Sequence, residues 1–545
     1  MNTSELLLLA ARSGIKFWLD GDKLAYRGPR EAMTDELRNE IVLHKADLIA
    51  MLQTERLDAA STIQRVPLGE EDGWQLASGQ ERLWLIEHRI GASPLYNVHF
   101  RILWKGLLDR KMLADSISEI MVRHVPLRTT FTEFDGSPRA VVSSATTPDL
   151  ANLDLRNQHL EAKASAADAF ILAHQRTPFD LEKGPLMRAA VITLAGDDHI
   201  IVVTQHHLVT DGWSIGIFLT ELGQSYRARY LNRNARLPEL LVRYSDYARW
   251  QHEREAQQPY QERVAWWKEH LAGLSSLELP RARRVQTGAP NYHGIAQELS
   301  VPSALAARLK ELSRDLHCTL YTVLLTAWAT LLHRYSSQSD FAVGTLTNGR
   351  DLPELQNLIG FFTNTVLLRC DLSGNPSFVD AVGRLRAETE SAFEREVQFA
   401  DVVLAAGAVR DASLTPLIQA AFIFENIPMP QILDPEVGIR VMLDLQIDGS
   451  AEGTSKFDLA LFMQESNDGI RGCVTYADSQ FESSVFERIC EHFLTLLGSI
   501  INNPHETVGR LGIVSMGERR QLLGDWNDAE TWDEWPAATD IPVIR

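Results

Sequence analysis

The stretch Gln205-His206-His207-Leu208-Val209-Thr210-Asp211-Gly212-Trp213 decides how the rest of this chain is interpreted. It directly follows residues 200–204, a β-branched run that predicts a strand. Successive strand residues point to opposite sides, so one histidine is expected to enter a cleft while the other is held in the structure. Asp211 and Gly212 then predict a turn into a helix. This arrangement holds an imidazole rigidly for proton transfer near neutral pH.

The residues on either side of this stretch predict an α/β body with two large lobes. Strands are predicted at residues 189–194, 200–205 and 341–345, and helices at 303–316 and 320–335. A charged segment at 251–284, rich in Gln and Pro, is interpreted as a break that divides the body into halves of similar length. The 545 residues exceed what one hydrophobic core usually serves, which also favours two lobes.

Composition excludes several classes of partner. The net charge of -19 disfavours nucleic acid, because it repels a phosphate backbone. The four cysteines are far apart and form no Cys-x-x-Cys pair, which argues against a zinc cluster or a disulfide framework. The apolar residues Leu6 to Ala11 are too short for a membrane span, and Glu5 precedes them where a signal peptide carries positive charge. We therefore expect a cytoplasmic protein with no membrane partner.

Other chemistries for the two histidines are less well supported. His206, His207 and Asp211 are metal-ligand types, but adjacent strand residues diverge, so no metal is expected. A Ser-His-Asp hydrolase is not expected either. The chain has no Gly-x-x-x-x-Gly-Lys-Ser/Thr loop, so nucleotide phosphate chemistry has no support. A purely structural role for both histidines stays open.

The His206-His207-x-x-x-Asp211-Gly212 pattern resembles the His-His-x-x-x-Asp-Gly signature of nonribosomal peptide synthetase condensation domains. Further stretches match that family in its order along the chain: 78–84 (SGQERLW), 123–131 (RHVPLRTTF), 178–186 (PFDLEKGPL), 244–250 (YSDYARW), 359–365 (IGFFTNT), 410–417 (RDASLTPL) and 456–459 (KFDL). Three places depart from the family pattern. Gly79 stands where the family usually has alanine, residues 125–126 lack a common acidic residue, and residues 398–400 match poorly.

The resemblance implies a fold of two chloramphenicol-acetyltransferase-like lobes, each of α+β two-layer type, in a V shape. It places the second histidine, His207, at the centre of a tunnel between the lobes. It makes Asp211 a structural residue that forms a salt bridge with an arginine of the second lobe, for which Arg350 is the candidate.

His206 and Gly212 complete the catalytic set, since the Gly212 backbone is suited to the charge that develops on the attacked carbonyl oxygen. Trp213 and Asn364 are candidates for the tunnel wall. Whether His207 acts as a general base or only positions the nucleophile stays open.

The first residues predict a separate small module. Residues 15–27 read as two strands around an Asp-Gly turn, and residues 34–52 show helical spacing. The module resembles the tubulysin-type docking domains, in which a C-terminal segment of an upstream carrier protein adds a strand along the hairpin. The candidate docking residues are Lys16, Trp18, Lys23, Leu24 and Arg27.

The predicted divisions are a docking domain (1–57), a linker (58–72), two lobes (73–250 and 251–507) and an extended tail (508–545). The predicted reaction is transfer of an acyl or peptidyl group from a carrier-bound phosphopantetheine thioester to a carrier-bound or soluble amine or alcohol. No cofactor of the chain's own is expected. The enzyme is expected either to be freestanding and chain-releasing or to be part of a larger synthetase. The alternatives are a noncatalytic platform that recruits carriers and an acyltransferase that uses acyl-coenzyme A.

Overall fold

The computed structural model divides the chain into two compact units, Met1–Val66 and Pro67–Arg545. The structure describes residues 16–20, 23–27, 41, 45, 63–66, 73–144, 147–280, 294–407, 417–425, 433–434, 439–444, 454–466, 469–478, 481 and 488–525.

The first unit contains the predicted β-hairpin. Strands β1 (Lys16–Asp20) and β2 (Lys23–Arg27) pair antiparallel, with Lys16 opposite Arg27 and Asp20 opposite Lys23. Residues 41 and 45, inside the predicted helical stretch, are helical. The apolar stretch at residues 6–11 and the side chains of the five candidate docking residues lie outside what the structure describes.

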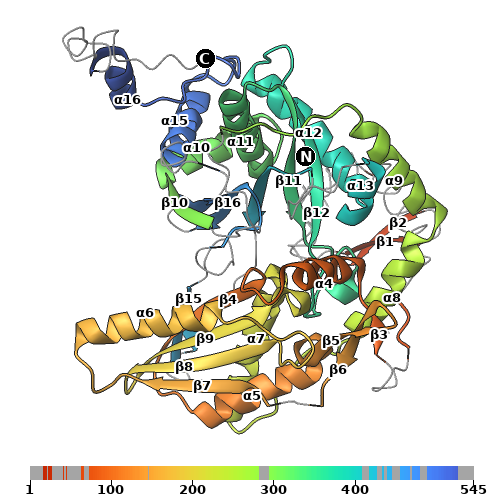
Figure 1. Ribbon diagram of the computed structural model, residues 1–545, viewed down its shortest axis with the longest axis vertical. Coiled ribbons are helices and arrows are strands. Elements are labelled where there is room, and N and C mark those ends of the chain that lie inside the picture. The colour runs from red at the N-terminus through yellow and green to blue at the C-terminus, as the bar shows by residue number, and fades with distance from the viewer. Residues whose placement is uncertain are drawn as a thin grey trace, which may run out of the picture. The chain divides into compact units, whose positions relative to one another are not determined.

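The first lobe of the second unit is built on a six-stranded sheet (Figure 1). In spatial order its strands are β14 (Leu433–Asp434), β15 (Ile439–Asp444), β4 (Asn97–Lys105), β9 (Asp198–His206), β8 (Met187–Ala195) and β7 (Asp149–Asp154). The helices that cover it are α5 (Arg110–Arg123), α6 (Leu160–Arg176) and α7 (Gly212–Tyr230).

Helices α6 and α7 lie on opposite faces of this sheet. The ring of Phe100 in β4 packs edge-on against Phe218 of α7. On β9, Val202 packs with Ile171 of α6. Val202 pairs with Arg101, the neighbour of Phe100, and successive strand residues alternate between faces. The sheet is therefore buried on both sides, which matches the continuous apolar run in β9.

The second lobe holds another six-stranded sheet, in which β13 is parallel to both of its neighbours. Its strands in order are β10 (Gly294–Pro302), β17 (Gly469–Ala477), β16 (Leu459–Ser466), β13 (Ala420–Glu425), β11 (Asp340–Thr347) and β12 (Asn364–Asp371). Its helices are α10 (Ser303–Asp315), α11 (Leu320–Ser336), α12 (Phe378–Glu394), α13 (Phe399–Ala405) and α15 (Ile489–Asn502). The fully buried Trp328 of α11 packs edge-on against Phe493 of α15 in the core of this lobe.

Smaller elements complete the second unit. A three-stranded sheet consists of β3 (Trp74–Gln75), β6 (Ser137–Val142) and β5 (Thr129–Phe134). The remaining helices are α4 (Ser78–Ile90), α8 (Tyr244–Glu255), α9 (Gln258–His270) and α16 (Met516–Arg520), with 3-10 turns η2 (Val125–Arg128), η3 (His207–Val209) and η4 (Pro353–Leu355) and a π-turn η5 (Gln521–Asp525).

The predicted strands and helices of the body are confirmed as β8, β9, β11, α10 and α11. The predicted break at 251–284 is wrong in its first half, where α8 ends and α9 follows. The charges of α9 form its exposed side, while Trp267 is buried in the core of the second lobe. Proline is tolerated in the first turn of a helix, which is where Pro259 lies.

Two further features differ from the predictions. The tail is not extended at its start: Val508 and Leu511 are buried, and α16 follows them. Glu518 of α16 pairs with Arg488 and His492, so ionic contacts hold this segment to the lobe. Strand β15 also comes from the predicted second-lobe segment but pairs with β4 in the sheet of the first lobe.

In the described part of the chain no single helix is long and apolar enough to cross a bilayer; α10 and α11, bent by 105° to each other, pass that test of length and composition only as a pair.

Candidate active site

The two histidines lie where strand β9 runs into helix α7, as the sequence predicts. Strand β9 ends at His206, the single turn η3 begins at His207, and α7 begins at Gly212. Asp211 caps the helix, because its carboxylate accepts a hydrogen bond from Ser214 N at 2.8 Å. Strand, turn and helix thus fix the backbone on both sides of His207.

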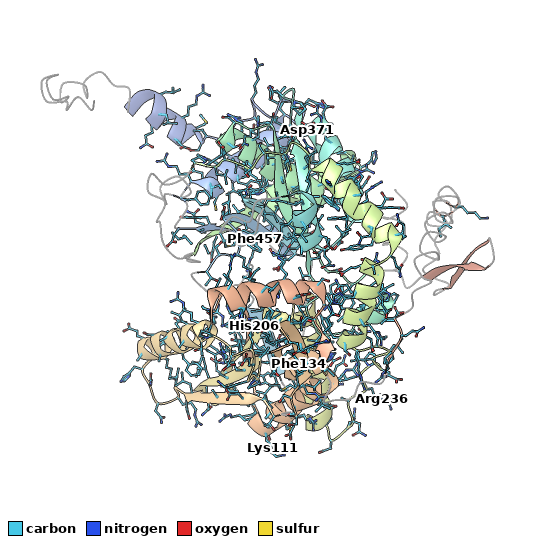
Figure 2. The ribbon with its side chains drawn as sticks, turned by 45° about the vertical axis from the view of Figure 1, so that its right-hand side comes forward. Lys111, Phe134, His206, Arg236, Asp371 and Phe457 are labelled. Carbon is cyan, nitrogen blue, oxygen red and sulfur yellow. The ribbon has the colours of Figure 1, made fainter. Side chains whose placement is uncertain are left out.

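His206 is held inside the first lobe, whereas Phe457 lies in the second (Figure 2). The His206 side chain is buried, and its Nδ1 accepts a hydrogen bond from Leu208 N at 3.2 Å. A neutral imidazole has one donor and one acceptor nitrogen, so Nε2 carries the proton and faces Glu87 Oε1 at 3.5 Å. These contacts make His206 a structural partner of α4.

His207 has the opposite environment and lines a cavity. Its Nδ1 lies 2.9 Å from the Thr210 carbonyl oxygen, which only accepts, so Nδ1 must be the donor. Nε2, on the far side of the ring, is then the acceptor. Burial, reinforced by the nearby positive charge of Lys456, lowers the pKa of His207 to about 3. The ring is therefore neutral near pH 7, and its Nε2 is able to accept a hydrogen bond.

Asp211 joins the two lobes. Its Oδ1 lies 3.0 Å from Arg350 Nη2, and its Oδ2 accepts a hydrogen bond from Phe362 N at 3.0 Å. Arg350 Nη2 also donates to the Leu358 carbonyl, and its guanidinium lies 4.0 Å from the centre of the Phe362 ring. The structure thus places the candidate ion pair at the base of the turn that carries His207.

Residues 212–216 read Gly-Trp-Ser-Ile-Gly, which matches the Gly-x-Ser-x-Gly pattern of serine hydrolases and which the sequence interpretation did not take into account. The structure assigns Ser214 another role. The side chain is fully buried, and its Oγ lies 2.7 Å from Asp211 Oδ1 and 3.0 Å from the Gly360 carbonyl oxygen. Ser214 does not line the cavity, so it joins the interlobe network and is not mounted as a nucleophile.

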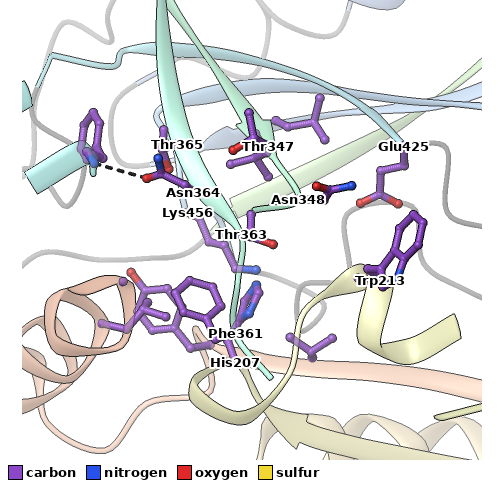
Figure 3. Close-up of a pocket in the computed structure, with 18 of the residues that line it drawn as sticks. His207, Trp213, Thr347, Asn348, Phe361, Thr363, Asn364, Thr365, Glu425 and Lys456 are labelled. Carbon is purple, nitrogen blue, oxygen red and sulfur yellow. Dashed lines mark hydrogen bonds between the residues drawn. The ribbon is translucent and has the colours of Figure 1, made fainter. Parts of the chain in front are cut away.

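The cavity has a volume of about 380 Å³ and is lined by residues of both lobes (Figure 3). From the first lobe they include Gly79, Arg82, Tyr96, His207, Gly212 and Trp213. From the second lobe they include Thr347, Phe361, Asn364, Phe399, Glu425 and Lys456. The predicted residues His207, Gly212, Trp213 and Asn364 are thus brought together, while His206, Asp211 and Arg350 support them from outside the wall.

Trp213 and Asn364 are both anchored. Trp213 Nε1 donates to the Gln356 carbonyl at 3.0 Å. Asn364 Nδ2 donates to Glu396 Oε1 at 2.8 Å, and Asn364 Oδ1 accepts from Phe399 N at 3.2 Å. Burial raises the pKa of Glu396. Asn364 therefore fixes the second-lobe wall through its own hydrogen bonds.

The sequence interpretation missed two residues beside His207. The ring of Phe361 meets the His207 ring edge-on, with 5.0 Å between ring centres. The Lys456 side chain extends toward the same two rings (Figure 3). Both residues lie in stretches that resemble the family, at 359–365 and 456–459, but nothing in one sequence shows that these stretches meet at His207.

In the described part of the chain, no group of three or more His, Cys, Asp or Glu side chains is arranged to hold a metal ion. Fold and site together define a protein of two α/β lobes, with a neutral imidazole in a cavity between them and a buried ion pair that ties the lobes below it.

Comparison with known families then identifies the chain. Residues 70–523 match the Condensation domain family, and residues 4–54 match the TubC N-terminal docking domain. The chain belongs to the condensation domain family of nonribosomal peptide synthetases, preceded by a docking domain of the TubC type.

Among its curated relatives is chondramide synthase cmdD of Chondromyces crocatus, which is 34% identical over 463 residues. The match covers 85% of this chain but only 12% of that synthase. Phosphinothricin tripeptide synthetase PhsB of Streptomyces viridochromogenes is 33% identical over 469 residues, covering 85% of this chain and 39% of that protein. The chain thus spans well under half the length of either relative.

Solved structures agree on the fold. The X-domain from teicoplanin biosynthesis superposes with a TM-score of 0.72 at 23% identity, covering 83% of this chain and 100% of that one. The first condensation domain of the calcium-dependent antibiotic synthetase gives a TM-score of 0.69 at 18% identity, covering 82% and 100%. The predicted mixed α/β condensation fold is confirmed.

Proposed function

We propose that this chain transfers an acyl or peptidyl group from the phosphopantetheine thioester of a carrier protein to an amine or a hydroxyl group. The single observation that carries the proposal is the state of His207. Its Nδ1 is committed to the Thr210 carbonyl, so Nε2 is an acceptor in a cavity that both lobes line. Membership of the condensation family and the names of the synthetases among its relatives support this chemistry.

The proposed reaction forms one bond and breaks one. The nucleophilic nitrogen or oxygen attacks the thioester carbonyl carbon, the carbon–sulfur bond breaks, and the proton of the nucleophile finally resides on the released thiol. His207 Nε2 accepts a hydrogen bond from the attacking N–H or O–H and directs its lone pair at the carbonyl. A ring with a pKa of about 3 takes up a proton reluctantly, which supports positioning ahead of full proton abstraction.

The start of α7 supplies the second element of the mechanism. Gly212 is the first residue of this helix and lines the cavity. The N-terminal end of a helix carries partial positive charge, which favours the negative charge that develops on the carbonyl oxygen. The chain needs no cofactor of its own for this reaction, because the thioester brings the activated carbonyl.

The docking unit is proposed to deliver the donor. In the part of the first unit that the structure describes, β1 and β2 form a two-stranded sheet, so each strand offers an edge. A C-terminal segment of an upstream carrier protein would add along such an edge through backbone hydrogen bonds. Lys16, Lys23 and Arg27 favour an acidic segment.

The decisive experiment loads a short acyl thioester onto the upstream carrier and offers carrier-bound and soluble amines and alcohols to the full chain. Products are quantified by mass spectrometry for the wild type, for His207→Ala and for the exposed-histidine control His505→Ala. We expect product from the wild type and the control, and at least about a hundredfold less from His207→Ala, the scale of loss when a reacting group is no longer held in position. The acceptor that reacts shows whether the bond is an amide or an ester and whether a soluble acceptor releases the chain.

Three other outcomes would overturn the proposal. Equal product from the wild type and His207→Ala would remove His207 from the chemistry. No product from any variant, together with intact binding of the carrier, would indicate a noncatalytic recruitment platform. Efficient product from free acyl-coenzyme A would show that the carrier is not the required donor.

A further inference from the structure

Two of the three departures from the family pattern meet at the cavity wall. Gly79, Phe399 and Ala400 all line the cavity that holds His207, whereas residues 125–126 do not. Gly79 lies on α4 of the first lobe and faces Phe361 of the second. Phe361 in turn contacts the ring of His207. Gly79, which differs from the family pattern, is thus linked through the ring of Phe361 to the imidazole of His207.

The contact between Gly79 and Phe361 leaves little room for a side chain. A Cβ atom at position 79 would lie 3.0 Å from Phe361 Cε1 and 3.4 Å from Cδ1. Gly79 lies in the first turn of α4, and glycine forms helices less readily than alanine, so the helix itself does not account for this residue. The glycine is explained by the space that the Phe361 ring occupies.

The Phe361 backbone is fixed, so the ring cannot withdraw with it. Gly360 N donates to Ser214 Oγ at 3.1 Å, and Phe362 N donates to Asp211 Oδ2 at 3.0 Å. The Tyr244 hydroxyl donates to the Phe361 carbonyl oxygen. A Cβ on Gly360 would lie 2.2 Å from the Tyr244 ring, so this stretch is also closely packed. The ring contacts both α4, at Gly79, and the ring of His207.

We propose that Phe361 is a specificity-determining residue that restricts the acceptor to amines or alcohols whose nucleophilic atom is borne by an unbranched carbon, and that Gly79 makes room for it. This rests on the proposed function, in which Nε2 of His207 holds the nucleophile. The carbon bearing the nucleophile then lies within reach of the Phe361 ring, whose centre is 5.0 Å from that of His207. A methyl branch on this carbon would compete with the ring for space.

The test compares two isomers that differ only in this branch. n-Butylamine and sec-butylamine, or 1-butanol and 2-butanol if the enzyme forms esters, are offered with one acyl carrier to the wild type and to Phe361→Ala. We expect the wild type to prefer the unbranched isomer in kcat/KM by at least tenfold, the usual scale for one methyl group, and Phe361→Ala to reduce that preference to within about threefold. A donor arm compares carriers loaded with butyryl and isobutyryl groups. The ratio of kcat/KM between these two donors should be the same in the wild type and in Phe361→Ala.

Gly79→Ala provides an independent check. The added methyl group would displace the Phe361 ring, which contacts His207, so kcat with the unbranched isomer should fall at least fivefold, and the double variant Gly79→Ala/Phe361→Ala should recover it. A loss that persists in the double variant would show that Gly79 acts through the fold and not through Phe361.

An unchanged isomer preference in Phe361→Ala would overturn the inference while leaving the proposed function intact. A change confined to the donor arm would overturn it as well, because Phe361 would then limit the acyl group. Absence of any His207-dependent product would overturn the proposed function and this inference with it.

Discussion

Arg350 Nη2 lies 3.0 Å from Asp211 Oδ1, and each side chain is only 1% exposed. The pair connects the turn that carries His207 to the second lobe. The carboxylate of Asp211 also accepts a hydrogen bond from Phe362 N. A carboxylate removed from water in this way depends on its partners for the solvation that it has lost.

Replacing Arg350 with alanine is therefore expected to lower the free energy of unfolding by about 3–5 kcal/mol, because Asp211 is left buried without its cation. Urea denaturation followed by fluorescence measures the loss. The control is Lys111→Ala, which breaks the exposed pair with Asp115 and should cost no more than about 0.5 kcal/mol. Similar losses in the two variants would show that the Asp211–Arg350 pair carries no special stability.

The pH dependence of stability should report on His207. In the folded chain its pKa is about 3, whereas an unfolded histidine has a pKa of about 6.5. Between these values the unfolded state binds more protons, so stability falls as the pH falls, by up to about 1.4 kcal/mol per pH unit for this one group. Above about pH 6.5 the contribution is complete.

The variant His207→Asn removes this dependence, so the difference in unfolding free energy between wild type and variant should shrink or reverse from about pH 7 to about pH 5. Urea titrations at several pH values measure it, with the exposed His505→Asn as control. Parallel profiles for wild type and His207→Asn would mean that the folded ring takes up a proton as readily as the unfolded one.

Lys456→Met should raise the pKa of His207, because the lysine charge opposes protonation of the ring. NMR titration of the His207 ring protons measures the shift. Lys183→Met is the control, since Lys183 is exposed and pairs with Asp180. If the two variants shift the His207 pKa equally, the charge of Lys456 does not act on the ring.

Charge reversal on the hairpin should weaken carrier docking. The double variant Lys16→Glu/Lys23→Glu is expected to lower the affinity for an acidic C-terminal carrier peptide at least tenfold at low salt and less at high salt, because salt screens exposed charges. Fluorescence anisotropy with a labelled peptide measures it on the full chain, with Lys183→Glu as control. Unchanged affinity would indicate that the peptide binds elsewhere or without these charges.

Much of the fold and part of the site could be predicted because local pattern decides them. The apolar run before His206, the Asp211 cap and the helical spacing after Gly212 each depend on neighbours in sequence, and the structure contains the strand, the turn and the helix. The contacts of His206 and His207 differ as expected, but strand alternation is not the reason, because only His206 lies on β9 and His207 begins the turn η3 that follows it.

What could not be predicted depends on distant segments. Phe361 reaches His207 only because the second lobe packs on α4, and its ring has the same local signature as any core phenylalanine. From the sequence alone, the charged residues of α9 are interpreted as a break between the lobes. The opposite side of this helix, which carries Trp267, is recognisable as a buried side only when the helix is seen packed against the second lobe. The local sequence of β15 does not specify which sheet this strand joins.

The position of β15 has a consequence for how the protein is made. During synthesis on the ribosome, residues 97–105 emerge long before residues 439–444, yet β4 finds its outer neighbour only in that late segment. Until then its backbone amides and carbonyls form an open edge, which is a template for pairing with another nascent chain. We therefore expect the first lobe to complete its folding only after most of the second has been translated, so that a truncated first lobe expressed alone would aggregate.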